Sequence, residues 1–184
     1  MVGQDRSAQS AMIRRCKDED FEQIWAIIND GATAYRGAIP AYCWAEPYMT
    51  KDELHQDLAA GITFWGCEMI GHLQGVMGLQ SVQDVTLIRH AYVRTSAQRQ
   101  GIGASLLSHL QPLAQKPILI GTWADARWAI RFYQKHGFHL VGREQAQHLM
   151  ERYWRISDWQ RELSVVLAEM SAERFFEGDA EMPQ

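Results

Sequence analysis

Cysteine is scarce in this sequence of 184 residues. The three cysteines, Cys16, Cys43 and Cys67, are far apart, and no two have the C-x-x-C spacing of a redox or zinc motif. An odd number of scattered cysteines provides neither a disulfide framework nor a zinc site. The simplest interpretation is three buried thiols in a reducing cytosol, and no metal cofactor is expected.

Long apolar segments are lacking as well. The longest uncharged run, residues 69–83, is interrupted by His72, Gln74, Gln80 and three glycines. It falls short of the ~20 apolar residues that span a bilayer. Residues 1–6 are polar and do not form the apolar core of a signal peptide. We therefore expect a cytoplasmic protein with no membrane partner.

Neither sign of charge is in large excess. Eighteen Lys and Arg residues against 22 Asp and Glu residues give a net charge of −4, which predicts no nucleic-acid partner. A hydrophobic content of 47% excludes a chain that is disordered throughout. The length and the absence of repeats or linkers predict one domain, residues 11–170, between flexible tails at 1–10 and 171–184.

The apolar pattern within this domain alternates between strands and helices, which predicts a mixed α/β fold. Strands are expected at 11–16, 62–68, 73–79, 85–93, 117–123, 138–142 and 162–167. Helices are expected after the acidic residues 18–20, at 50–60, after Gly103, at 127–136 and at 144–154. Thr50 and Glu53 have the spacing of a capping box. Residues 35–49, with two prolines and several aromatic rings, are typical of a loop that borders a binding site.

The stretch that follows the strand at 85–93 is typical of an anion-binding loop. It carries Arg94, Arg99, Gly101 and Gly103 and leads directly into a helix. The first amides of a helix lack internal partners and carry partial positive charge, so they bind phosphate groups well. The alternative is a sharp turn with solvated arginines. The stretch is not a Walker loop, which needs Lys-Ser/Thr, nor a dinucleotide fingerprint, which needs a third glycine.

Two motifs in order carry a resemblance to a known family. Gln98–Gly103 fits the pattern Q/R-x-x-G-x-G/A, and Ala129–Phe138 is a helix that ends in K-x-G-F before a strand. The pair resembles the GNAT superfamily of N-acetyltransferases. The resemblance implies a single α+β domain with a mixed, mostly antiparallel central sheet, a V-shaped splay in it, and helices on both faces. It also implies acetyl-CoA as cosubstrate and direct attack by a primary amine in a ternary complex.

The resemblance further implies which residues bind the cofactor. The pyrophosphate would be held by backbone amides, and the pantetheine arm would pair with the strand that ends at residue 93. The residues implied are Ala91, Tyr92, Val93, Gln98, Arg99, Gln100, Gly101, Ile102, Gly103, Ala104 and Phe132.

Three residues have implied catalytic roles. The amide of Val93 would bind the developing oxyanion, and Tyr133 would protonate the departing thiolate, unless it only packs on the cofactor. The family often has a glutamate base on this strand; here His90 is the one side chain that can act as a base near neutral pH, with a buried structural histidine as the alternative. An asparagine often found before the second motif is replaced by Ala126, and Asp125 is a candidate to cap that helix instead.

The acceptor side is expected at the loop 35–49 and at the segment 144–154. Its candidate residues are Arg36, Trp44, Glu46, Tyr48, Arg89 and Trp123, with the alternative that the aromatic residues only fill core. Arg89, if it points inward, favours an acceptor with a carboxylate or phosphate. The acceptor is a small-molecule or peptide amine. Family members are frequently homodimers, but no interface is indicated by the sequence.

Other hypotheses remain open. An acyl-CoA-binding sensor or scaffold without chemistry is supported by the missing glutamate and asparagine. An acetyl-cysteine intermediate has no support, because nothing places a cysteine beside the cleft. A nucleic-acid binder using Arg94 and Arg99 is disfavoured by the acidic net charge.

Overall fold

The computed structural model describes residues 11–169, which form a seven-stranded sheet in the order β1-β2-β3-β4-β5-β7-β6. The strands are β1 Met12–Arg15, β2 Thr63–Met69, β3 His72–Val82, β4 Val85–Val93, β5 Ile118–Trp123, β6 His139–Leu140 and β7 Ser164–Ala168. The helices are α1 Phe21–Ala32, α2 Lys51–Ala59, α3 Ile102–Leu110, α4 Arg127–Lys135, α5 Arg143–Tyr153 and α6 Asp158–Glu162. The tails predicted at 1–10 and 171–184 lie outside the described residues.

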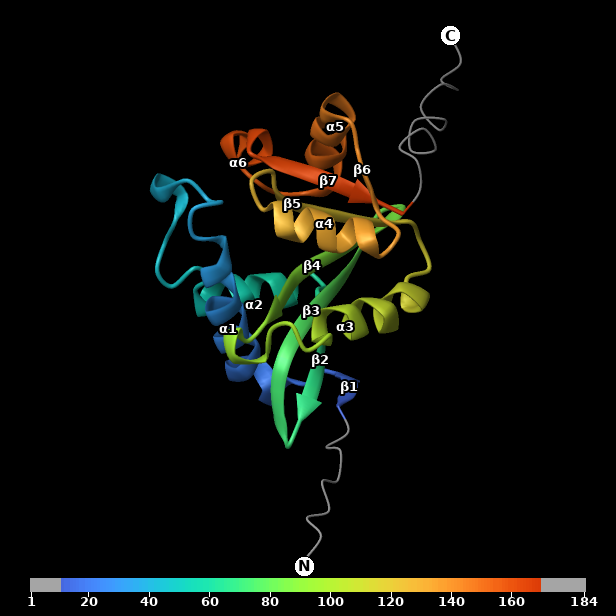
Figure 1. Cartoon of the computed structure of the whole chain (residues 1–184). Helices are drawn as coiled ribbons and strands as arrows, with labels where there is room; N and C mark the ends of the chain where they lie inside the picture. The colour runs from blue at the N-terminus through green and yellow to red at the C-terminus, as the bar shows by residue number, and fades with distance from the viewer. Residues whose placement is uncertain (1–10, 170–184) are drawn as a thin grey trace, which may run out of the picture.

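The sheet is mixed and mostly antiparallel, as the resemblance implied. Strands β1 to β4 form an antiparallel meander, and β5, β7 and β6 also pair antiparallel. Only the pairing between β4 and β5 is parallel. The sheet therefore consists of two antiparallel halves, which Figure 1 shows as a lower unit with α1 to α3 and an upper unit with α4 to α6.

The two halves separate along β4 and β5. These strands pair at three positions, the last of which joins Ile88 to Ile120. Beyond it, β4 continues to Val93 alongside β3, while β5 continues to Trp123 alongside β7. His90 has a left-handed φ of 49°, and the β3–β4 register shifts between Val76 and Gly78. Such a bulge bends and twists a strand, which turns the end of β4 away from β5.

Helices cover both faces of the sheet, because successive side chains of a strand point to opposite sides. On one face, Leu106, Leu107 and Leu110 of α3 pack against apolar residues of β3, β4 and β5. On the other face, Ile24, Ile27 and Ile28 of α1 join Leu54 of α2 over β2 and β3. A third cluster packs Leu149 and Met150 of α5 against β4, β5 and β7.

Local sequence signals account for most of these elements. The predicted capping box is present at α2, where the Thr50 N–H donates to Glu53 Oε2 at 2.7 Å and the Glu53 N–H donates to Thr50 Oγ1 at 3.2 Å. The prediction that Asp125 caps α4 is wrong. Ala126 is the N-cap residue and no side chain caps this helix, because the chain reaches it through a tight turn closed by backbone bonds.

Two further expectations need correction. The short helix α6 was not predicted, although Ser157 stands at its N-cap and Gln160 three residues later, the spacing of a capping box. Of the three cysteines, Cys67 is buried, whereas Cys16 and Cys43 are only half-buried. Within residues 11–169, no helix combines the length and the apolar content that crossing a bilayer requires.

Candidate active site

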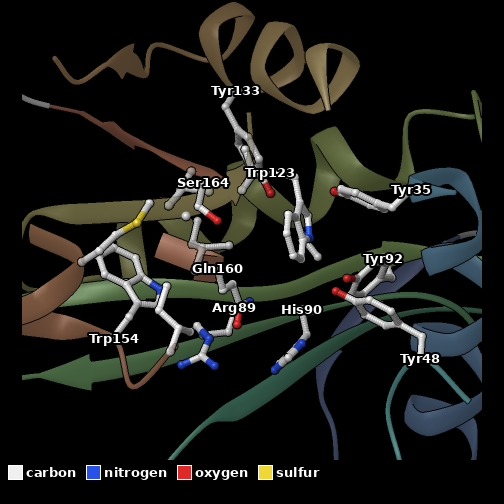
Figure 2. Close-up of a pocket in the computed structure, with 17 residues that line it drawn as sticks. Tyr35, Tyr48, Arg89, His90, Tyr92, Trp123, Tyr133, Trp154, Gln160 and Ser164 are labelled. Atoms are coloured by element: carbon white, nitrogen blue, oxygen red, sulfur yellow. The ribbon is translucent and has the colours of Figure 1, made fainter. Parts of the chain in front are cut away.

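Two cavities meet where β4 and β5 diverge. The larger, of about 650 Å³, lies between α3, α4 and the end of β4. The smaller, of about 150 Å³, lies between β4, β5, β7 and the segment that connects α5 to α6. Four residues, Tyr35, Ala91, Tyr92 and Tyr133, line both cavities. The cleft therefore offers two approaches to one junction, with Tyr133 beside it (Figure 2).

The loop before α3 is held in place by α1. Asp30 accepts hydrogen bonds from the Thr95 backbone N–H at 2.6 Å and from its hydroxyl at 3.0 Å. Arg99 and Gly101 both have positive φ, 62° and 79°. Glycine adopts this conformation without steric cost, which accounts for glycine at position 101. Gly101 is the N-cap of α3 and no side chain caps the helix there. The first amides of α3 are thus left without a side-chain acceptor, which favours binding of an anion.

The larger cavity gathers most of the predicted cofactor-binding residues. Those that line it are Ala91, Tyr92, Val93, Gln98, Arg99, Gly101, Ile102, Gly103, Ala104 and Phe132. Gln100 lies at the exposed tip of the loop and does not line the cavity. Arg94, a second candidate for charge in the loop, instead donates from Nε to the Leu73 carbonyl at 3.0 Å and ties the loop to β3.

The backbone of Val93 faces the cleft. The Arg94 N–H donates to the Gln74 carbonyl at 2.8 Å, and Val93 stands opposite Gly75 in the same ladder. Hydrogen-bonded and non-hydrogen-bonded pairs alternate along an antiparallel ladder. The bond from Arg94 to Gln74 makes Val93 and Gly75 a non-hydrogen-bonded pair. The N–H of Val93 therefore points away from β3, toward the side from which β5 has diverged.

Glycine at position 75 allows α3 to lie close to this strand. A Cβ atom added to Gly75 would be 2.7 Å from Ile102 Cγ2 and 3.2 Å from Val93 Cγ2. Ile102 is the first residue of α3, so any side chain at position 75 would displace the start of the helix. No local sequence signal distinguishes Gly75 from other strand glycines, so it was not among the predicted site residues.

Tyr133 is buried on α4, and its side chain extends into the cleft (Figure 2). Burial raises its pKa far above the ordinary value. Burial likewise raises the pKa of Tyr35 to about 12, against a hydrogen bond with Thr122, and that of Tyr92 well above 10.0. These phenols stay protonated at neutral pH, so they can donate hydrogen bonds but cannot serve as bases.

His90 lines the smaller cavity and is paired with a residue that the sequence analysis did not identify. Its Nε2 atom lies 2.8 Å from Asp57 Oδ2, on α2, and its ring stacks on Phe64. Burial acts to raise the pKa of Asp57, but the hydrogen bond and charge of His90 and the charge of Arg89 outweigh it, so the pKa is lowered. An ionised carboxylate only accepts, so Nε2 carries the hydrogen and Nδ1 is left to accept a proton.

Arg89, the neighbour of His90, also lines the smaller cavity. Its Nη1 atom donates to Gln80 Oε1 at 2.9 Å, and its Nη2 atom lies 3.9 Å from Asp57 Oδ1. Burial lowers the pKa of Arg89, and the charge of Asp57 opposes this effect. The guanidinium is thus a half-buried cation at the wall of the cavity.

Half of the residues expected to contact the acceptor lie elsewhere. Tyr48, Arg89 and Trp123 line the smaller cavity, whereas Arg36, Trp44 and Glu46 line neither cavity. Arg36 forms an ion pair with Glu46 and lies over the Trp44 ring, whose Nε1 donates to Glu46 at 3.2 Å. The three side chains satisfy one another at the surface of their own loop, which is why they do not reach the cleft.

Much of the rest of the smaller cavity comes from the C-terminal part of the chain, namely Met150, Trp154, Ile156, Gln160 and Ser164. The segment 144–154 expected on the acceptor side thus contributes Met150 and Trp154. The Trp154 ring lies against Gly121, where an added Cβ would be 3.3 Å from the indole. No cysteine lines either cavity, so the structure gives no support to an acetyl-cysteine intermediate.

Comparison with known proteins agrees with this geometry. A sequence model of the acetyltransferase (GNAT) domain matches residues 17–151, which include the loop before α3, the diverging ends of β4 and β5, and Tyr133. The chain belongs to the GNAT acetyltransferase family. No curated protein sequence matches it.

Solved structures of GNAT proteins share the fold at low sequence identity. The PaiA N-acetyltransferase from Thermoplasma acidophilum, solved in complex with coenzyme A, has a TM-score of 0.66 and 18% identity, over 87% of this chain and 98% of its own. The ribosomal-protein-S18-alanine N-acetyltransferase from Escherichia coli has a TM-score of 0.61 and 17% identity, over 86% and 92%. The ribosomal-protein-alanine N-acetyltransferase from Brucella melitensis has a TM-score of 0.58 and 21% identity, over 85% and 96%.

Proposed function

We propose that this GNAT protein is an acetyl-CoA-dependent N-acetyltransferase that moves an acetyl group to a primary amine by direct attack in a ternary complex. The observation that carries the proposal is the meeting of two cavities at Tyr35, Ala91, Tyr92 and Tyr133. A donor and an acceptor that enter from opposite sides can react at this junction without a covalent enzyme intermediate.

The larger cavity suits coenzyme A. Its mouth is formed by the uncapped start of α3, with Arg99 beside it, and both favour a pyrophosphate. Its inner end is formed by Val93, whose N–H faces the cleft and can bond to an extended pantetheine arm. The coenzyme A complex of the Thermoplasma acidophilum structure supports this assignment.

In the proposed reaction, the amine nitrogen forms a bond to the thioester carbonyl carbon. The N–H of Val93 stabilises the negative charge on the carbonyl oxygen. The carbon–sulfur bond then breaks, and Tyr133 gives its proton to the departing sulfur. The amine loses a proton to His90 Nδ1 or to water, and solvent returns a proton to Tyr133.

The acceptor is a small-molecule or peptide amine. Two of the similar structures are named for acetylation of an alanine of ribosomal proteins, so peptide N-termini belong in any test. The test is release of free thiol from acetyl-CoA against alkylamines, amino acids and short peptides, together with calorimetric binding of CoA. Turnover with at least one amine supports the proposal, and CoA binding without turnover on any of them favours a sensor or scaffold instead.

A further inference from the structure

The charges at the wall of the smaller cavity are of one sign. Arg89 is the one charged side chain among the residues that line it, apart from His90, whose charge depends on protonation. No carboxylate lines this cavity in the described part of the chain; Asp57 lies behind Arg89 and His90 on α2. A cationic substrate group therefore finds no partner here, whereas an anionic one does.

The Arg89 guanidinium keeps capacity for a ligand. It has five N–H donors, and with residues 11–169 its side chain forms one hydrogen bond, from Nη1 to Gln80. Its separation of 3.9 Å from Asp57 is too long for a hydrogen bond. The Asp57 carboxylate is instead engaged by His90 at 2.8 Å. Arg89 is thus held in position by Asp57 and Gln80 without being saturated.

The size of the cavity limits what can reach this guanidinium. A volume of about 150 Å³ is comparable to a cavity that accommodates one benzene molecule. Aromatic rings form much of its wall, with Trp154 at one end, Tyr48 and Tyr92 at the other, and Trp123 between them (Figure 2). A compact molecule fits, with its polar groups at the two ends and an apolar body between the rings.

We propose that the acceptor is a small amino acid in the broad sense, a primary amine that carries a carboxylate, and that Arg89 binds this carboxylate while the amine points at Ala91. This inference rests on the proposed acetyl transfer. The planar fork of a guanidinium matches the two oxygens of a carboxylate.

Arg89 and Ala91 stand on either side of His90, whose left-handed φ of 49° bends β4 at this point. The preferred separation of amine and carboxylate is therefore measured directly, with ω-amino acids of increasing length from glycine to 5-aminovalerate that include 4-aminobutyrate.

The experiment compares each acid with its uncharged amide. Steady-state kcat/KM is measured with acetyl-CoA for 4-aminobutyrate and 4-aminobutanamide, and binding of the same two compounds to the protein–CoA complex is measured by calorimetry. We expect the wild type to prefer the acid by about ten-fold or more, since a charge-assisted pair is lost with the amide. Arg89→Gln should bring the ratio close to one, and Arg89→Lys should keep part of it. Arg143→Gln, at an exposed arginine that lines neither cavity, is the matched control.

The outcomes separate this inference from the proposed function. Two results would overturn the inference and leave acetyl transfer standing. In the first, amines are acetylated but the wild type does not prefer the acid over the amide. In the second, Arg89→Gln prefers the acid as strongly as the wild type does. If no amine is acetylated, acetyl transfer fails, and calorimetry still decides whether Arg89 selects the acid. Unchanged CoA affinity in the Arg89 variants shows that they are folded.

Discussion

The Nε2 atom of His90 lies 2.8 Å from a carboxylate oxygen of Asp57, 33 residues earlier in the chain. The bulge at His90 and the last turn of α2 bring the two together at the wall of the smaller cavity. The pair fixes the ring and assigns the hydrogen to Nε2, which leaves Nδ1 as the proton acceptor. A half-buried histidine with this support is better suited to take a proton from an amine than an isolated one.

We expect His90→Gln to lower kcat by about 10²-fold, the lower end of what a general base contributes. The loss should shrink at alkaline pH, because the amine then arrives already neutral and needs no base. Asp57→Asn should give a smaller loss, since its amide can still hold the ring but no longer fixes the tautomer. The rates are measured from pH 6 to 9.5 at saturating acetyl-CoA, and a pH-independent loss would indicate a structural role for the pair.

Tyr133→Phe should lower kcat by about 10²-fold and leave CoA affinity nearly unchanged. The ring and its packing remain, and only the proton for the sulfur is removed. Tyr153→Phe is the matched control, because Tyr153 is also buried but donates to Asp84, away from both cavities. Thiol release and calorimetry measure the two effects. Unchanged turnover in Tyr133→Phe would remove this residue from the mechanism.

The buried phenols predict that stability falls at alkaline pH. Burial raises the pKa of Tyr35 to about 12, and those of Tyr92 and Tyr133 well above 10.0. Above pH 10 the unfolded chain releases these protons while the folded chain retains them. The free energy of unfolding therefore decreases by about 1.4 kcal/mol per pH unit for each such phenol, and the contribution is intact below pH 10.

Urea unfolding at pH 8, 10 and 11 tests this dependence, with phenolate absorbance recorded in the same samples. These tyrosines should ionise together with unfolding rather than before it. Phenolate absorbance that rises fully in the folded protein near pH 10 would contradict the burial of the cluster.

Gly75→Ala should destabilise the protein by about 1–3 kcal/mol, as overpacking does in a dense core. The added methyl would be 2.7 Å from Ile102, so the start of α3 must move and CoA affinity should fall as well. Gly103→Ala is the control for stability, because its added Cβ makes an ordinary contact of 3.5 Å with Phe132 and alanine favours a helix. Chemical denaturation measures both variants, and equal stabilities would show that α3 can shift freely.

Elements with a strong local pattern were predictable from the sequence. The bounds of β4, Val85–Val93, match the predicted strand, and the capping box of Thr50 and Glu53 correctly placed the start of α2. The helix α6 was not predicted because five residues are too few to show a helical period. Its capping signal is weak without an apolar run after it.

The lining of the larger cavity was largely predictable because much of it is contiguous. Many of its residues lie in one strand–loop–helix segment, and the role predicted there for backbone amides depends on the turn rather than on particular side chains. Gln100 is the exception in this segment, since its place at the tip of the loop depends on how the turn is closed. Where a turn directs one side chain is not encoded in its spacing.

The smaller cavity is assembled from segments that lie far apart in the chain. The sequence by itself determined the order of strands and helices and the loop that suits a pyrophosphate, because both depend on interactions between near neighbours in the chain. Only the tertiary structure decided that Asp57 supports His90, that Trp154 lies on Gly121, and that Arg36 and Trp44 pair with Glu46 instead of reaching the cleft. The first two contacts join residues that are 33 positions apart in the chain, and the third depends on how the loop 35–49 closes on itself. Neither outcome is specified by a periodic pattern, because both follow from packing rather than from the spacing of near neighbours.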